Sequence, residues 1–438
     1  MTVAELIVKM LPIHPLPPAT SGKVVVGPWR FSHLMKAPHR LAFAAGATML
    51  AVATLWWALV LTARAAGLAL PWAVVPSSAH GLVMSLGFMP LFVAGFAFTA
   101  GPRWLGLPEV SARALRLPVL SMLGGWALAL PGFHASVALA SVGLAAVALG
   151  WSAIASRFVQ LLRASTAPDK LHATLLAVTA AVGVLTLWSA AAALALESEP
   201  LLRTATAVAL WGFLTPLFVT VAHRMLPFFT AGALPQQRAW RPDTLLWAML
   251  GAVVAELPFA VAELWWWPLP TWLRWLQVAI EAPAALLLLW LALHWGLVQS
   301  LKIRLLAMVH LGFLWLGIAL ALGAISHTQM ALQGAAHSLG LAPLHALTMG
   351  YLGSTLLAMA TRVTAGHSGR PLAADNLAWA LFWTLQAAVV LRLGGALWTA
   401  ASAPLVLAAA AAWLVAMVGW ALRYGGWLGR PRADGRPG

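Results

Sequence analysis

The sequence HALTMGYLGSTLLAMATRVTAGHSGRP, residues 345–371, has the pattern of a helix that crosses a lipid bilayer. It begins with a histidine, stays apolar for about four helical turns, and ends in the polar group Arg362, His367 and Arg370. At ~1.5 Å per helical residue, His345 and Arg362 lie roughly 25 Å apart, which is most of the hydrocarbon thickness. The stretch therefore predicts a transmembrane helix with an imidazole near one end.

The composition of the whole chain agrees with this interpretation. Of its 438 residues, 62% are hydrophobic and only 8% are charged, whereas a soluble domain is about a quarter charged. Because no alternating strand pattern is present, a membrane β-barrel is disfavoured. We predict an all-α polytopic membrane protein with twelve transmembrane helices. The apolar runs lie at roughly 41–63, 80–101, 117–134, 136–156, 171–196, 203–223, 243–263, 275–299, 304–326, 338–361, 376–396 and 402–422.

The positions of the basic residues predict the orientation. If the N-terminus is cytoplasmic, all but four of the 26 lysines and arginines fall on the cytoplasmic side. We therefore expect both termini in the cytoplasm: residues 1–40 as an N-terminal arm, 41–422 as the transmembrane domain and 423–438 as a basic tail. The net charge of +15 then marks the cytoplasmic rim, where lipid is the partner, and nucleic acid is not expected.

Cysteine is absent from the chain. This excludes disulfides, thiolate metal sites, iron–sulfur clusters and covalently attached c-type haem. Any haem bound here would be non-covalent, as in the b type.

Histidines outnumber acidic residues, thirteen to eleven, and polar side chains inside a membrane are functional candidates by default. The predicted topology sorts them into two levels. The outer level contains His80, His134, His327, His337 and His345. The inner level contains His223, His294, His310 and His367.

Two of the outer histidines share a local pattern. His80 begins HGLVMSLG and His345 begins HALTMGYLG, with a methionine four residues later and a glycine one turn beyond. In an α-helix these positions share a face, so two such helices would clamp a haem between two imidazoles. The simpler interpretation is that each histidine is an interfacial residue and that the methionines and glycines serve packing. The residues alone leave both interpretations open.

Two carboxylates are also expected inside the membrane, Glu256 and Glu281. They are candidates for a proton relay or a substrate path, or they pair with a buried arginine or histidine. A second class of function uses them differently: in a haem-free secondary transporter, the histidines and Glu256 would line a path, with helices interrupted at Pro90 or Pro216.

The opening stretch also resembles the most recognisable block of the NnrS family, in which a histidine-led helix runs into M-x-TRVT-x-GH-x-GRPL; here the block ends at Leu372. GFAFTAGPRWLG (95–106) is similar to that family's end of helix 2, and HRMLPFFT (223–230) and HLGFLWLG (310–317) are looser matches. The resemblance implies a twelve-helix protein that carries haem, is reported to contain copper, and is linked to nitric oxide and nitrosative stress. The layout also looks distantly like the catalytic subunit of haem–copper oxidases.

The chain departs from the family pattern in helix 2. The family opens this helix with H-A-H-E-M; with His80 aligned to the first histidine, this chain has Leu82 and Val83 in place of the second histidine and the acid. Copper binding at that site therefore loses a ligand. The run 243–263 also contains no histidine, which disfavours a complete oxidase-type copper centre.

The prediction is thus an NnrS-type, haem-binding protein of the bacterial inner membrane that binds, senses or detoxifies nitric oxide, as an oxidoreductase if it turns over. His80 and His345 are the predicted axial ligands, with His337 and His310 as alternatives, and Arg362 is expected to anchor the cytoplasmic end of its helix. Electrons would come from quinol or a periplasmic donor. The alternatives are the haem-free transporter and a degenerate relative that keeps only a structural haem.

Overall fold

The protein is all-helical in the computed structural model, which describes residues 27–436 and has no strand among them. Eleven helices in this part of the chain are long and apolar enough to cross a membrane. They are α3 (Pro38–Ala65), α4 (Pro76–Leu86) with α5 (Met89–Trp104), α6 (Arg113–Ala135), α7 (Val137–Ala164), α8 (Leu171–Ala195), α9 (Glu199–Val208) with η1 (Ala209–Leu214) and α10 (Thr215–Ala233), α11 (Asp243–Val254) with α12 (Glu256–Trp265), α13 (Thr271–His294), α15 (Arg304–Gln333), α18 (Asn376–Leu397), and η3 (Thr399–Ala401) with α19 (Ser402–Leu428). The chain is therefore a multi-pass membrane protein.

The remaining predicted run, 338–361, is not one of these eleven. It consists of three consecutive elements, α16 (Ala342–His345), the π-helix η2 (Ala346–Gly353) and α17 (Ser354–His367). Two short helices, α2 (Phe31–Leu34) and α14 (Leu297–Ser300), complete the described elements.

The boundary between the third and fourth predicted runs, 117–134 and 136–156, lies within one residue of its predicted place. α6 ends at Ala135 and α7 begins at Val137, and the Ser136 side chain accepts a hydrogen bond from the backbone N–H of Leu139. This is an N-cap, which satisfies one of the free donors at a helix start. Pro131 lies inside α6, four residues before the helix ends.

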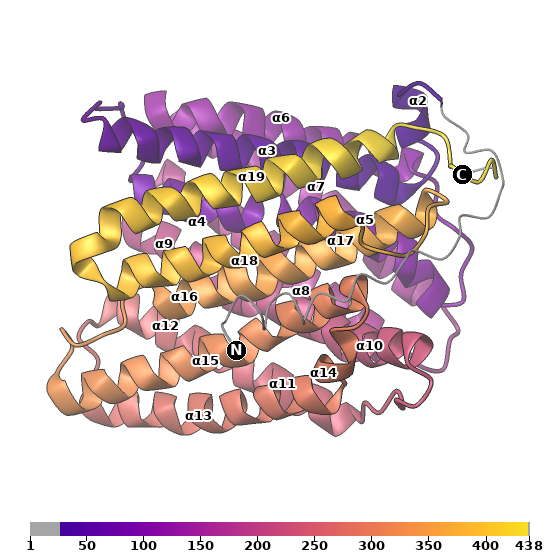
Figure 1. Cartoon of the computed structure of the whole chain (residues 1–438). Helices are drawn as coiled ribbons and strands as arrows, with labels where there is room; N and C mark the ends of the chain where they lie inside the picture. Colours follow the sequence, from indigo (N-terminus) through magenta and orange to yellow (C-terminus); the bar gives the residue numbers. More distant parts are fainter. Residues whose placement is uncertain (1–26, 437–438) are drawn as a thin grey trace.

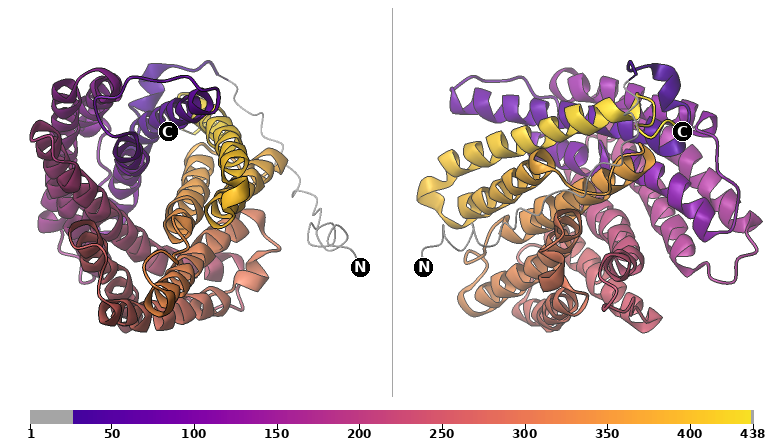
Figure 2. Two further views of the ribbon diagram at one scale, coloured as in Figure 1. Left: turned by 90° about the vertical axis from the view of Figure 1, so that its left-hand side faces the viewer. Right: turned by 45° about the vertical axis from the view of Figure 1, so that its right-hand side comes forward.

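The helices run roughly side by side (Figure 1) and, seen end-on, are arranged as a ring (Figure 2). The first and last long helices, α3 and α19, pack against each other and close this ring. Among the eleven candidate spans, α4–α5 and α9–η1–α10 are the most buried. The bundle interior is thus occupied mainly by the helices that carry His80, His223 and Pro216.

Several chain segments meet at one end of the bundle. The backbone N–H of Arg30 donates to Gly429 O at 2.8 Å, and the Arg40 guanidinium donates to Leu428 O at 3.0 Å. The backbone N–H of Ala433 donates to Ser368 O at 2.9 Å. The N-terminal end of α3 and the C-terminal ends of α17 and α19 therefore lie at the same end of the bundle.

The predicted domain limits differ slightly from the observed helices. α3 begins at Pro38, before the predicted limit at residue 41, and α19 continues to Leu428, past the predicted limit at residue 422. Residues 1–26 of the predicted N-terminal arm lie outside the described residues.

Candidate functional site

His80 lies one turn inside α4 rather than at its start, because Pro76 begins the helix. Proline suits the first turn, where its missing N–H leaves no hydrogen bond unmade. The imidazole stacks on the indole of Trp57 from α3, with ring centroids 4.0 Å apart and an angle of 25° between the planes. Its Nδ1 atom is buried without a partner, while the residue as a whole stays half-buried. The ring is thus fixed in direction but not saturated with hydrogen bonds.

His345 is the last residue of α16 and is also half-buried. Its Nδ1 lies 2.9 Å from the carbonyl oxygen of Leu341, one turn earlier. Since a carbonyl only accepts, the proton is on Nδ1 and the lone pair is on Nε2. Histidine ligands of metals are commonly oriented by such a bond from the other ring nitrogen.

The two histidines come from distant parts of the sequence and lie close enough for the charge of one to act on the other. Arg392 of α18 lies within the same electrostatic range of both. No carboxylate in residues 27–436 forms an ion pair with Arg392. The site therefore combines two imidazoles with an arginine whose charge has no protein counter-ion there.

The other three outer histidines have different surroundings. Both ring nitrogens of His134 are used, because Nε2 accepts from the Trp56 indole at 2.9 Å and Nδ1 lies 2.9 Å from Pro71 O. His327 is bonded to Glu281. His337, an alternative ligand in the sequence prediction, is exposed in the loop between α15 and α16.

The remaining predicted site residues lie elsewhere. His310 is fully buried near the start of α15, and its Nε2 lies 2.8 Å from the hydroxyl of Thr230 on α10. Arg362 is near the end of α17, with its guanidinium 3.9 Å from the ring centre of Phe229. It is separated from His345 by seventeen residues, or roughly 25 Å of helix. Neither residue is brought to the pair His80 and His345.

The predicted pattern, a histidine, a methionine and a glycine on one face of an α-helix, is not kept in the segment that begins at His345. Residues 346–353 form a π-helix, whose turn contains more than the 3.6 residues of an α-helix. His345, Met349 and Gly353 therefore do not follow the face that His80 and Met84 define on α4. A π-turn inside an α-helix is a common feature of functional sites, and the sequence contains no simple signal for it.

η2 is held against its neighbours by close contacts. A Cβ at Gly350 would lie 2.8 Å from the Trp315 ring of α15. The Trp315 indole donates to Gln386 Oε1 at 2.7 Å, and the Gln386 amide donates to the Ser354 hydroxyl at 2.9 Å. α15, α17 and α18 are thus joined directly beside the π-turn.

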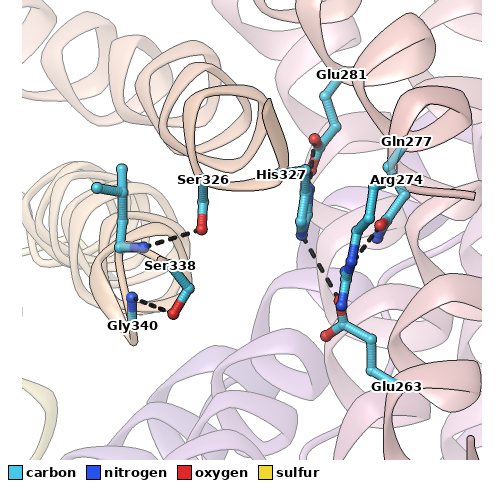
Figure 3. Close-up of polar contacts among 9 residues, drawn as sticks. Glu263, Arg274, Gln277, Glu281, Ser326, His327, Ser338 and Gly340 are labelled. Carbon is cyan, nitrogen blue, oxygen red and sulfur yellow. Dashed lines mark hydrogen bonds and ion pairs between the residues drawn. The ribbon is translucent and has the colours of Figure 1, made fainter. Parts of the chain in front are cut away.

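A second polar group lies between α12, α13 and α15 (Figure 3). His327 Nδ1 lies 2.8 Å from Glu281 Oε2, and His327 Nε2 lies 3.7 Å from Glu263 Oε1. Arg274 is ion-paired with Glu263 and donates to Gln277 Oε1 at 2.9 Å. Glu256 and Glu281 are both buried and lie within reach of a hydrogen bond between their carboxyl groups. The sequence predicted Glu256 and Glu281 as carboxylates inside the membrane and His327 as an outer histidine. It did not predict a role for Glu263.

The described residues offer a metal ion only one or two protein ligands at any one place. Residues 27–436 contain no group of three or more histidine, aspartate or glutamate side chains placed to hold a metal ion. A haem iron needs at most two protein ligands. Each of the two histidines has a ring nitrogen of the required kind, Nε2 of His345 and the unpartnered Nδ1 of His80. α11 and α12 carry carboxylates but no histidine.

The comparison with protein families gives one match over nearly the whole chain. Residues 33–432 match the sequence model described as "NnrS protein". No curated protein matches the chain. The matched region includes His80, His345, Arg392 and the polar group between α12, α13 and α15.

Proposed function

Since the chain belongs to the NnrS family, we propose that it is a haem-binding protein of the bacterial inner membrane that binds, senses or detoxifies nitric oxide. The proposed cofactor is a b-type haem held by His80 and His345. When bound, a haem would supply an iron that takes up an electron and binds a small gas molecule. The chain's own residues determine where that iron can lie.

The observation that carries this proposal is the state of the two imidazoles. His345 has Nε2 free because Nδ1 is engaged by Leu341 O, and His80 is set by its stack on Trp57 without using its hydrogen-bonding capacity. Burial favours the neutral imidazole that metal binding needs. Arg392 supports the proposal because an unpaired guanidinium near both rings suits a haem propionate.

The two imidazoles would hold the haem through its iron. A haem held there would supply one of two kinds of chemistry, nitric oxide binding or electron transfer. With quinol or a periplasmic protein as donor, the first case makes the protein an oxidoreductase acting on nitric oxide. The second makes it an electron carrier or a relative with a structural haem.

The proposed topology has twelve crossings with both termini in the cytoplasm. It takes α16–η2–α17 as the twelfth crossing, because this segment is 26 residues long by its bounds, Ala342–His367, and lies between the candidate spans α15 and α18. The shared end of α3, α17 and α19 would then be the cytoplasmic rim, and His80, His345 and Arg392 would lie toward the periplasm.

The test is a visible spectrum of the protein purified from haem-replete cells. The proposal expects a Soret band in the wild type that is lost or shifted in His80→Ala and in His345→Ala, but kept in His134→Ala, the matched outer histidine. A colourless wild type would overturn the haem proposal and favour the transporter. A band that survives both substitutions would place the haem elsewhere. Adding nitric oxide to the reduced protein then separates a gas-binding iron, whose band shifts, from one that keeps both imidazoles.

A further inference from the structure

The side chains between α12, α13 and α15 form an ordered series from the rim of the bundle into its interior. We call Glu263, His327, Glu281 and Glu256, in that order, the Glu–His chain. The exposed fraction falls over its first three members, from 31% for the Glu263 side chain to 15% for His327 and 3% for Glu281. Glu256, at the inner end, is buried. An ion pair with only a structural role has no need of such a gradient.

The sequence of each helix places these groups on one face. Glu256 and Glu263 are seven residues apart on α12, and Arg274, Gln277 and Glu281 occupy positions i, i+3 and i+7 on α13. Residues at these spacings are neighbours on a helix surface. Seven residues correspond to roughly 10 Å along the helix, so Glu256 and Glu281 lie about two turns from the rim formed by the α12–α13 turn.

A glycine gives the Glu281 carboxyl its space. A Cβ at Gly323 of α15 would overlap Glu281 Oε1, and Gly323 precedes His327 by four residues, on the same face. Helix α15 thus contacts both oxygens of Glu281: Gly323 leaves space for Oε1, and the imidazole of His327 bonds to Oε2.

Charge balance limits how many protons this group holds. Arg274 neutralises Glu263 through their ion pair. Within residues 27–436, His327 is the one base that is bonded to Glu256 or Glu281. Two buried carboxyls within hydrogen-bonding reach of each other share a proton, because both cannot be ionised in a low-dielectric interior. Glu256 Oε1 is buried without a partner, so this end of the series is free to accept or release one.

We propose that the Glu–His chain is a proton path that connects the rim at the α12–α13 turn with Glu256 inside the bundle. Glu281, holding the shared proton, releases it to the Glu256 carboxylate. The Glu281 carboxylate then accepts the Nδ1 proton of His327 at Oε2, while His327 takes a proton at Nε2 from the side of Glu263. Each N–H or O–H bond that forms is matched by one that breaks, so one proton moves inward and no electron is transferred.

The first step spans the longest gap. The distance of 3.7 Å between His327 Nε2 and Glu263 Oε1 exceeds a hydrogen bond, so a bridging water or a small approach completes it. Arg274 holds Glu263 by the ion pair and is itself buried. Arg274 is therefore a positioning residue and does not carry the proton.

The test is hydrogen–deuterium exchange of the buried carboxyl, followed by infrared spectroscopy after the purified full-length protein is mixed into D2O. Glu256→Gln and Glu281→Gln identify the carboxylic acid C=O band by its loss. His327→Phe and His327→Gln should keep that band and slow its shift on deuteration by about a hundredfold, the lower end of what a positioned proton-transferring group contributes. His327→Gln retains a hydrogen-bond donor for Glu281 and so guards against a variant that misfolds.

Two controls make the result specific. His294→Phe, at the other end of α13 with its ring stacked on Trp290, should leave the exchange rate unchanged. Free imidazole in the buffer should restore fast exchange in His327→Phe. An exchange rate that is the same in wild type and both His327 variants would overturn the proposal, as would the absence of any C=O band that the glutamate substitutions remove. The readout needs no haem, so a colourless protein with fast, His327-dependent exchange would reject the proposed cofactor and keep the path.

Discussion

Trp57 covers one face of His80: their rings are 4.0 Å apart at the centroids and tilted by 25°. The two residues come from consecutive helices, α3 and α4, and stacking on the Trp57 indole fixes the orientation of the His80 imidazole. We expect Trp57→Leu to leave the fold intact and to weaken the haem band, because the ring gains rotational freedom. An offset-stacked pair contributes about 0.5–1.5 kcal/mol beyond its burial. The visible spectrum measures the outcome, and Trp188→Leu, at an exposed indole, is the control. An unchanged haem content in Trp57→Leu would contradict this role.

Arg392 is expected to hold an anionic group beside the two imidazoles. Removing its charge in Arg392→Gln should speed haem loss to an acceptor protein by about tenfold to a hundredfold, since a hydrogen bond to a charged group contributes about 1.5–3 kcal/mol. Arg392→Lys should recover part of the difference, because it keeps the charge and loses the fork geometry. Arg64→Gln, at an exposed position near the end of α3, should not change the rate. Equal rates for the two glutamine variants would remove Arg392 from the site.

Gly350 is expected to tolerate no side chain. Gly350→Ala would place a Cβ 2.8 Å from the Trp315 ring, and overpacking of this kind costs about 1–3 kcal/mol. The measurement is the thermal unfolding midpoint together with the haem band. Gly124→Ala is the matched control, because a Cβ there meets nothing within 4 Å; it should be neutral or slightly stabilising. A neutral Gly350→Ala would show that η2 can move away from α15 without cost.

Gln386 bridges the indole of Trp315 and the hydroxyl of Ser354 inside the bundle. Gln386→Leu would leave both groups unpaired, at a cost of about 1–3 kcal/mol for each, and should lower the unfolding midpoint. Thr384→Ala, two residues away on α18, removes a hydroxyl that bonds only to Ala380 of its own helix and should have little effect. Similar midpoints for the two variants would mean that the bridge does not stabilise the protein.

The features that depend on hydropathy were predictable from the sequence. The family and the multi-pass helical class are confirmed, and eleven of the twelve predicted runs correspond to helices that qualify as spans. The twelfth run, 338–361, overlaps the opening stretch and is not among these helices. The structure divides it into α16, η2 and α17, and the sequence has no simple signal for the π-turn at 346–353.

The site residues also divide into those that the sequence predicted and those that depend on how the helices pack. His80 and His345 stood out because polar groups are rare in a membrane, and the assignment of a haem to them stays a prediction. Trp57 and Arg392 could not be found, since stacking and long-range charge depend on which crossings become neighbours. Glu263 and His327 lie at the ends of two different runs. The contacts of His327 with Glu263 and with Glu281 form only when α12, α13 and α15 pack together.

The packing of α3 on α19 has a consequence for synthesis at the ribosome. The first crossing enters the membrane early, but the carbonyl groups that receive the Arg40 guanidinium belong to Leu428 and Arg430, which are translated almost last. Until then α3 lacks the helix that covers one of its flanks, and the Arg40 guanidinium lacks these two acceptors. A chain that ended before residue 430 would therefore leave the first crossing incompletely packed.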